Sequence, residues 1–499
     1  MKKKKWKKLY FKFYKNLNEE SQLKLNQFFD SLKQRLTLSK KDRKLLRIDF
    51  EKAFVKYQEL GISLDRGLEL LDLTNLGGFY SRPSSLWLPL DDTAKSYCQW
   101  VDKRSMSMFR IAAYLKENIQ PEILQMALNF SIKRYPEFAM SIRKGYFWHY
   151  LDSIRKRFPI EKESQLPVQR LPLTFTGSKA FRVLYFNNRI SVEFFHSMTD
   201  GTGAIEFLKT LVSCYLKLLN KNINDSPLII NENSVVDSDE FENAFSKINK
   251  ENKDNKFIEE KALQLGGKLS LDKPCRILHF RMPTDRLLKI SRSYGISVTA
   301  FMAAKIFNAS KRSIDEIEGD ISISIPVNMR KYFPTKTLRN FSLYCHLRNH
   351  IKTVEDNSEF YKKICDQLKQ YTSEENMVDM MATTANLIRS IKIFPLGIKT
   401  PINKSLFKLF GDRSQTMALS NLGKIELPED FANEILCFDF VLGTAVSNRA
   451  NCSLISVNNV STLTITKNTK DPSFEENLYN LLKEENIDIE VEGSEVYGR

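Results

Sequence analysis

The chain has 499 residues, of which 42% are hydrophobic and 27% charged, and a formal net charge of +16. These globular proportions exclude a largely disordered chain, and the length predicts two domains or a duplicated unit. No stretch of 18 or more apolar residues occurs, so no transmembrane helix is expected. The seven cysteines lie far apart without a C-x-x-C pair, which excludes a disulfide scaffold or zinc finger and is typical of a reducing compartment.

Most of the excess positive charge lies at the N-terminus. Residues 1–60 hold 15 Lys and 3 Arg against 7 acidic residues. Lysines interleaved with aromatic rings are typical of a segment that lies on an anionic membrane surface. The alternatives are a solvated basic tail and a segment that contacts nucleic acid. We expect the membrane surface as the partner and no nucleic acid. Residues 1–15 contain eight lysines, no acid and five aromatic residues: Trp6, Tyr10, Phe11, Phe13 and Tyr14.

Helices and a linker are predicted ahead of the main body. In residues 18–71 the large apolar residues recur near helical spacing, and Ser39 is placed to cap the second helix. Residues 74–85 (TNLGGFYSRPSS) are rich in Gly, Ser and Pro, as linkers are. We therefore assign residues 1–84 to a basic helical extension and linker.

From residue 85 strands alternate with helices, which predicts an α/β subdomain over residues 85–220. Two β-rich runs, 181–186 and 189–195, are separated by Asn187-Asn188. This pattern predicts a tight hairpin, because asparagine tolerates a positive φ. The other predicted elements are a strand over 106–115 and helices over 121–134 and 204–219.

The second half repeats this order of elements. Residues 221–269 are polar, with nine Asn in 220–255, and predict a crossover linker. Residues 270–499 predict a second subdomain, so the expected fold class is α/β with two similar halves. Its predicted strands are 275–282, 321–327, 341–348, 436–442 and 452–467, and its predicted helices are 298–311 behind Ser297 as N-cap, 357–394 and 473–484.

An H-x-x-x-D-G motif carries the clearest chemical signal. It runs from His196 to Gly201, between the second hairpin strand and the long helix. An imidazole with a near-neutral pKa can take a proton from a hydroxyl or amine as that group attacks a carbonyl. We expect Asp200 to hold the loop through an arginine or backbone N–H groups, and Gly201 to let the backbone turn and approach closely. No G-x-S-x-G elbow occurs, so no covalent acyl-enzyme is expected; the alternative is a histidine packed in a core turn.

Several segments resemble the CoA-dependent acyltransferases that share the chloramphenicol acetyltransferase fold, a family that includes condensation domains. The closest resemblance is to the bacterial alcohol-acetyltransferase-like and polyketide-associated acyltransferases, and it spans residues 85–499. It rests on the motif itself and on Leu88–Asp92, Ala127-Leu128 with Arg134–Phe138, Ile325–Arg330 with Asn340-Phe341, and Ser420–Gly423.

The resemblance implies two subdomains with mixed sheets around a central tunnel, in which His196 acts as general base. Asp200 would point away from the substrates and pair with an arginine, for which Arg330 is the candidate. Acyl-CoA would be the co-substrate and a hydroxyl, rather than an amine, the acceptor; neither a metal nor a bound cofactor is implied. Asn328, Ser420 and Asn421 would bind substrate or support the site, the last two near the tetrahedral oxyanion.

Two departures from the family bear on function. Phe195 replaces the first histidine of the H-H-x-x-x-D-G motif of condensation domains, which weakens a peptide-synthetase role, and the plant D-F-G-W-G segment is absent. A transferase that uses a carrier-protein thioester and a non-catalytic, membrane-associated binding protein remain as alternatives. The basic N-terminus adds the hypothesis that a substrate or product is lipid-like. We expect a cytoplasmic monomer. If residues 1–15 bind the membrane, the protein would be peripheral on its inner face.

Overall fold

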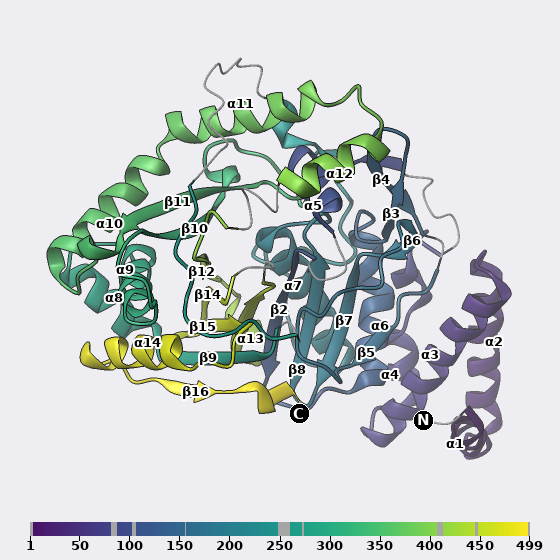
Figure 1. Cartoon of the computed structure of the whole chain (residues 1–499). Coiled ribbons are helices and arrows are strands. Elements are labelled where there is room, and N and C mark those ends of the chain that lie inside the picture. The colour runs from purple at the N-terminus through teal and green to yellow at the C-terminus, as the bar shows by residue number, and fades with distance from the viewer. Residues whose placement is uncertain are drawn as a thin grey trace.

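The computed structural model describes residues 3–80, 87–101, 106–154, 156–247, 260–271, 274–406, 413–444 and 448–497. Within these ranges two halves of mixed helix and strand lie side by side, and the N-terminal helices pack against the first half (Figure 1). The α/β class predicted from the sequence is confirmed. Among the described helices, none combines the length and the apolar character that a membrane span requires.

The N-terminal extension is helical, as predicted, and is part of the first hydrophobic core. Ser39 Oγ accepts a hydrogen bond from Asp42 N at 3.1 Å, so it caps the helix that begins at Lys40, as predicted; this is the third helix and not the second, because Lys3–Lys15 already form one. Tyr57 Oη donates to Leu218 O at 2.8 Å, which ties the extension to the first half. The helices are α1 (Lys3–Lys15), α2 (Glu19–Arg35), α3 (Lys40–Glu59) and α4 (Leu64–Leu70).

The aromatic residues of α1 divide between two faces. Trp6 and Phe13 are buried in the core, and Tyr10 and Tyr14 are half-buried beside it. Phe11 alone among the five is exposed, at 58%. Most of the aromatic signal at the N-terminus is therefore explained by packing of α1 against its neighbouring helices.

The first half contains a five-stranded sheet in the order β13-β2-β8-β7-β5. The predicted hairpin is confirmed, and Asn187 in its turn has a φ of 48°. Helices α6 (Pro121–Ser131) and α7 (Gly201–Leu218) pack against each other and the sheet. The strands are β2 (Met108–Leu115), β5 (Ile160–Lys162), β7 (Phe181–Phe186), β8 (Arg189–Phe195) and β13 (Ile435–Leu442).

Strand β13 comes from the second half of the sequence but pairs antiparallel with β2 of the first half. The predicted strand over 436–442 thus exists, yet it completes the other sheet. A smaller sheet of the first half has the order β1-β4-β3-β6. Its strands are β1 (Trp87–Pro89), β3 (Met140–Lys144), β4 (His149–Ser153) and β6 (Thr176–Lys179), and α5 (Asp92–Trp100) follows β1.

The second half contains a seven-stranded sheet in the order β11-β10-β12-β14-β15-β9-β16. The predicted strand run 452–467 is divided into two strands, because Asn458 and Asn459 adopt positive φ values of 48° and 62° and form a turn. The strands are β9 (Arg276–Pro283), β10 (Asp320–Asn328), β11 (Ser342–His350), β12 (Met417–Lys424), β14 (Ala450–Val457), β15 (Val460–Lys467) and β16 (Glu490–Glu492).

Helices cover this sheet and cross to the first half. Ser297 Oγ accepts from Ala300 N at 3.2 Å, so the predicted cap is confirmed. In Figure 1, α11 and α12 pass over the top of the molecule toward α5 and the small sheet. The helices are α8 (Thr284–Ser293), α9 (Val298–Lys311), α10 (Ser358–Tyr371), α11 (Glu374–Ser390), α12 (Leu396–Leu406), α13 (Glu429–Ala432) and α14 (Ser473–Glu484).

Candidate active site

The H-x-x-x-D-G motif forms the turn between β8 and α7. His196 N donates to Ser107 O at 2.8 Å, and Met198 N donates to Phe195 O at 2.9 Å. Asp200 then caps α7, because its Oδ1 accepts hydrogen bonds from the backbone nitrogens of the second and third helical residues, at 3.1 and 3.3 Å. Aspartate is a favoured N-cap, so the local sequence itself stops the strand and starts the helix.

The imidazole of His196 lies between two aromatic rings. Its centroid is 4.7 Å from that of Tyr97, in a stacked arrangement, and 5.0 Å from that of Phe109. Its Nδ1 is buried and makes no hydrogen bond with any residue that the structure describes. Burial lowers the pKa of His196, and the nearby Asp200 carboxylate opposes this shift. The imidazole is therefore neutral near pH 7, the form that accepts a proton.

Asp200 pairs with Arg330, the arginine that the sequence analysis named. Arg330 Nη1 donates to Asp200 Oδ2 at 2.7 Å, and Phe341 N donates to the same oxygen at 2.8 Å. Arg330 is held in turn by the carbonyls of Arg339, at 2.7 Å, and Thr337, at 3.0 Å. The ion pair joins the motif of the first half to the strand end of the second half.

Asn328 supports this arrangement from the end of β10. Its Oδ1 accepts from Arg330 N at 3.1 Å, and its Nδ2 donates to Thr202 Oγ1 at 3.3 Å. Since Thr202 lies in the first turn of α7, Asn328 links the arginine loop to the helix that follows the motif. These hydrogen bonds give Asn328 a supporting position.

Further contacts between the halves were not predicted from the sequence. The hydroxyls of Tyr97 on α5 and Tyr344 on β11 form a hydrogen bond. Thr199 Oγ1 donates to Leu338 O at 2.6 Å. Nothing in the sequence distinguishes Tyr97, or Phe109 on β2, from an ordinary core aromatic, so the rings that enclose His196 are a finding of the structure.

No model of a protein family matches the chain, and no curated protein matches it. Solved structures do match. TRI101 of Fusarium sporotrichioides, solved with coenzyme A and T-2, has 10% sequence identity and a TM-score of 0.57, over 82% of this chain and 100% of that one. TRI3 trichothecene 15-O-acetyltransferase of the same fungus has 13% identity and a TM-score of 0.53, over 80% and 94%. Polyketide synthase associated protein 5 from Mycobacterium tuberculosis has 13% identity and a TM-score of 0.51, over 79% and 96%.

The chain has the chloramphenicol acetyltransferase-like fold. The fold expected from the resemblance in the sequence is therefore confirmed. At these identities the likeness shows the fold alone, so the activity must be argued from the site.

Two glycines allow the halves of this acyltransferase-like fold to meet at the start of α7. A Cβ on Gly203 would overlap the backbone oxygen of Leu338 and Thr199 Oγ1, whereas a Cβ on Gly201 would meet mainly the end of the Leu422 side chain. Gly201 does not have a positive φ, so the turn that the sequence analysis expected there is not what requires glycine. The close approach of the second half is what requires glycine. Gly203, which the sequence analysis missed, is the more restricted of the two positions.

We expect Gly203→Ala to destabilise the protein by about 1–3 kcal/mol, as overpacking usually does, because the backbone of Leu338 must move. Gly201→Ala is the matched control and should cost less, since the Leu422 side chain can rotate away. Urea unfolding of both variants measures the difference. A larger loss for Gly201→Ala would contradict this account.

Ser420 and Asn421 lie on β12, whose end meets the start of α7 through Leu422. Asn421 Nδ2 donates to Thr299 Oγ1 at 2.9 Å, and its Oδ1 accepts from Gly423 N at 2.8 Å. These bonds fix the end of the strand. The predicted place of both residues, near the motif, agrees with this packing, and a role at the oxyanion stays a prediction.

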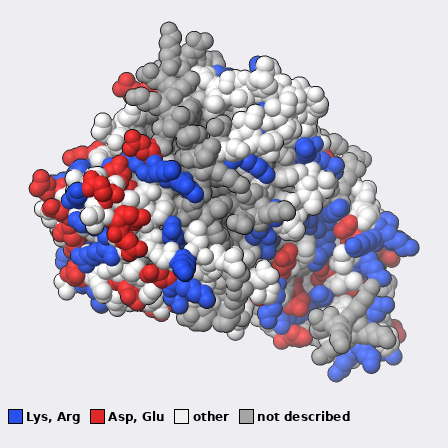
Figure 2. Space-filling model, viewed as in Figure 1, with Lys and Arg blue, Asp and Glu red and all other residues white. Residues whose placement is uncertain are grey.

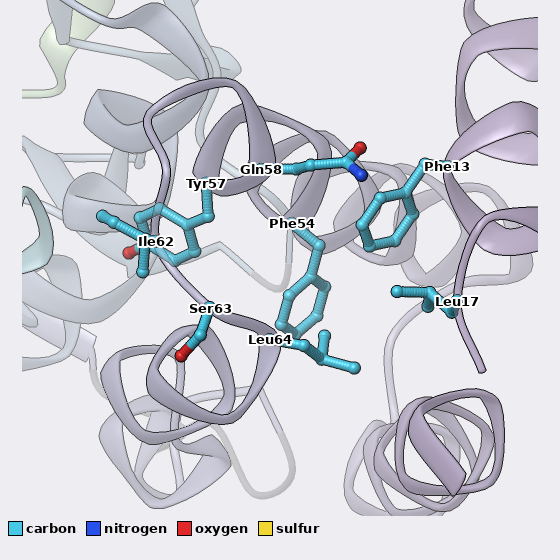
Figure 3. Close-up of a pocket in the computed structure, with 8 residues that line it drawn as sticks. All are labelled: Phe13, Leu17, Phe54, Tyr57, Gln58, Ile62, Ser63 and Leu64. Atoms are coloured by element: carbon cyan, nitrogen blue, oxygen red, sulfur yellow. The ribbon is translucent and has the colours of Figure 1, made fainter. Parts of the chain in front are cut away.

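A cavity of about 180 Å³ lies among the N-terminal helices. Figure 3 shows apolar side chains of α1, α3 and the start of α4 around it. None of its lining residues belongs to the elements that carry the motif, so it is separate from the candidate active site. The lining residues are Phe13, Leu17, Phe54, Tyr57, Gln58, Ile62, Ser63 and Leu64.

Proposed function

We propose that the protein is an acyltransferase that moves an acyl group from a coenzyme A thioester to a hydroxyl. One observation carries this proposal: the imidazole of His196 lies between two aromatic rings where the two halves meet, on a turn fixed by the Asp200–Arg330 ion pair. Burial lowers its pKa and so favours the form that accepts a proton. The matching structures support it, since TRI101 was solved with coenzyme A and TRI3 is an O-acetyltransferase.

In the proposed reaction, His196 Nε2 takes the proton of the acceptor hydroxyl while the hydroxyl oxygen attacks the thioester carbonyl carbon. A C–O bond forms and gives a tetrahedral intermediate, whose collapse breaks the C–S bond. The imidazolium then gives its proton to the departing thiolate. The products are an ester and a free thiol, and no acyl-enzyme is formed. Asp200 positions the turn through α7 and Arg330 and does not touch the substrates.

Ser420 is the candidate donor to the tetrahedral oxyanion, because it lies on the strand whose end packs against the start of α7. The hydrogen bonds of Asn421 to Thr299 and Gly423 favour a supporting role for that residue. Ser420→Ala should therefore mainly lower kcat. Asn421→Ala should mainly lower stability and should lower kcat less than Ser420→Ala does.

We further propose that a substrate or product is lipid-like and that the protein binds an anionic membrane through α1. The outward face of α1 carries Lys7, Lys8, Lys12 and Lys15, and all four are exposed around Phe11. Lys15 Nζ lies 4.6 Å from the centroid of the Phe11 ring. A ring that enters the headgroup boundary among lysines that meet phosphates fits such a surface.

Cosedimentation with anionic vesicles tests the α1 surface. Glutamine at the four lysines is preferable to deletion of the helix, because deletion would remove the buried Trp6 and Phe13 from the core. Weaker binding of the glutamine variant supports the membrane part of the proposal, and unchanged binding refutes it.

Release of free thiol from a panel of acyl-CoAs, short to long, tests the activity. Each acyl-CoA is assayed without an acceptor and with an alcohol, an amine or a glycolipid as acceptor. Thiol release that an alcohol stimulates supports O-acyl transfer, and the best acyl-CoA identifies the donor. No release from any acyl-CoA by the folded protein would favour a carrier-protein donor or a binding role.

The pH dependence of kcat/KM should show an acid limb below the ordinary histidine pKa of about 6.5. A general base works when deprotonated, and burial lowers the pKa of His196, so the base stays active to lower pH than a solvated histidine would. Asp200→Asn removes the charge that opposes this shift and should move the limb further down. Profiles between about pH 5 and 8 decide this; a limb above the ordinary value would contradict a buried neutral base.

A further inference from the structure

Large apolar side chains project from two neighbouring turns and one helix at an edge of the molecule. Two are on the turn between β3 and β4, two on the turn between α11 and α12, and two on the outer face of α12. Tyr146 is 72% exposed and Ile393 is 68% exposed. We call these six residues the tip surface: Tyr146, Phe147, Ile393, Phe394, Ile398 and Ile402, all of which are exposed.

The elements that carry the tip surface lie against each other although they are far apart in the sequence. Leu396 N, at the start of α12, donates to Tyr146 O at 2.8 Å and so joins the two turns. One turn of helix later, Lys399 Nζ lies 3.4 Å from the centroid of the Trp148 ring. Figure 2 shows the surface over α12 as mostly white with scattered blue.

The charged residues next to the tip surface in the sequence are of one sign. No acidic residue occurs between Asp379 and Asp412 or between Glu137 and Asp152. Lys144 and Lys392 are exposed beside the two turns. An apolar patch with a basic rim complements an interface that is apolar inside and anionic at its surface.

A buried lysine lies below the patch and faces an aromatic ring. Lys399 is only 4% exposed, and its amine makes no hydrogen bond with any described residue. Lys95, 5.4 Å from the same Trp148 ring, is by contrast paired with Asp92 at 2.7 Å. The face of the Trp148 ring is the partner of the Lys399 amine, which leaves the exposed Lys144 and Lys392 as the lysines that can meet lipid phosphates.

We propose that the tip surface seats the protein on an anionic lipid bilayer. Ile393, Phe394, Tyr146 and Phe147 enter the boundary between headgroups and acyl chains, and the surrounding lysines meet lipid phosphates. The side chains protrude from turns instead of lining a groove, which suits a deformable lipid phase better than a rigid protein partner. This surface is distinct from α1, and the inference does not depend on the proposed activity, because its readout is binding alone.

A bilayer at this place would lie beside the candidate active site. Asn403 of α12 donates a hydrogen bond to Gln99 of α5, and Tyr97 of the same helix stacks on His196. The tip surface is therefore two helices away from the imidazole, so apolar substrates dissolved in the membrane would be presented on the side of the site that α5 covers.

The experiment is flotation of the full chain with vesicles of phosphatidylcholine alone and of phosphatidylcholine with phosphatidylserine. The double variant Ile393→Glu with Phe394→Glu should reduce binding to the anionic vesicles by at least about tenfold. Lys144→Gln and Lys392→Gln should each weaken it about fivefold. Ile317→Glu is the matched control, because Ile317 is 81% exposed on another surface, and it should bind like wild type.

Thermal unfolding checks that the variants fold, and Tyr146→Glu with Phe147→Glu tests the same surface from the other turn. Reduced binding in both tip variants, with the control unchanged, supports the proposal. Wild-type binding in the tip variants overturns it, as does binding that is lost only when the α1 lysines are replaced. A wild-type dimer that fails to bind vesicles, and that the tip variants convert to a monomer, would assign the surface to a contact between copies of this chain.

Discussion

His196→Ala will lower kcat for acceptor-stimulated thiol release by at least about a hundredfold, the usual contribution of a general base. The physical reason is the loss of the imidazole that Tyr97 and Phe109 enclose, which is the group that takes the proton in the proposed reaction. Steady-state kinetics with the best acyl-CoA and alcohol from the panel measures the effect.

Two further variants make this result specific. His196→Asn preserves more of the packing between the two rings and should be as inactive as His196→Ala. His350→Ala should remain active, because His350 is at the surface and pairs with Glu318. Activity that survives in both His196 variants would place the chemistry elsewhere.

Asp200→Ala should cost about 3–5 kcal/mol of stability, the usual result of removing one partner of a buried ion pair. The carboxylate is buried and accepts hydrogen bonds from Thr202 N, Gly203 N, Arg330 and Phe341 N. Its removal opens the first turn of α7 and leaves the guanidinium of Arg330 without its anion. Urea unfolding at pH 7 measures the loss.

The control for this prediction is Asp225→Ala. Asp225 also forms an ion pair, with Lys217 at 2.7 Å, but its side chain is 71% exposed. The expected cost there is about 0–1 kcal/mol. Equal losses in the two variants would mean that the Asp200–Arg330 pair does not hold the halves together.

Local signals in the sequence predicted most elements correctly. Asn187-Asn188 gave the hairpin and Ser297 the start of α9, because a turn or cap depends on the conformational preference of one or two residues. The division of 452–467 was missed although Asn458-Asn459 repeats the first turn signal. The pairing of β13 with β2 could not be predicted, since register between distant strands depends on tertiary packing and leaves no local pattern.

The candidate site was predicted in part. His196 and Asp200 stand in a motif, and the arginine partner was named from a resemblance that also included its segment. Gly203 and Tyr97 could not be found in this way. The restriction at Gly203 comes from the backbone of Leu338, and the position of Tyr97 over the imidazole comes from the packing of α5, neither of which is encoded next to the residue concerned.

The crossing of β13 has a consequence for how the chain reaches its native state. Until residues 435–442 have been synthesised, β2 has β8 on one side and an open edge on the other. Unpaired strand edges readily join other chains, so a fragment that ends at residue 269 should aggregate instead of folding as an independent half. The first half can then complete its sheet only after nearly the whole chain has left the ribosome. The two halves therefore fold in one step, although each has its own sheet.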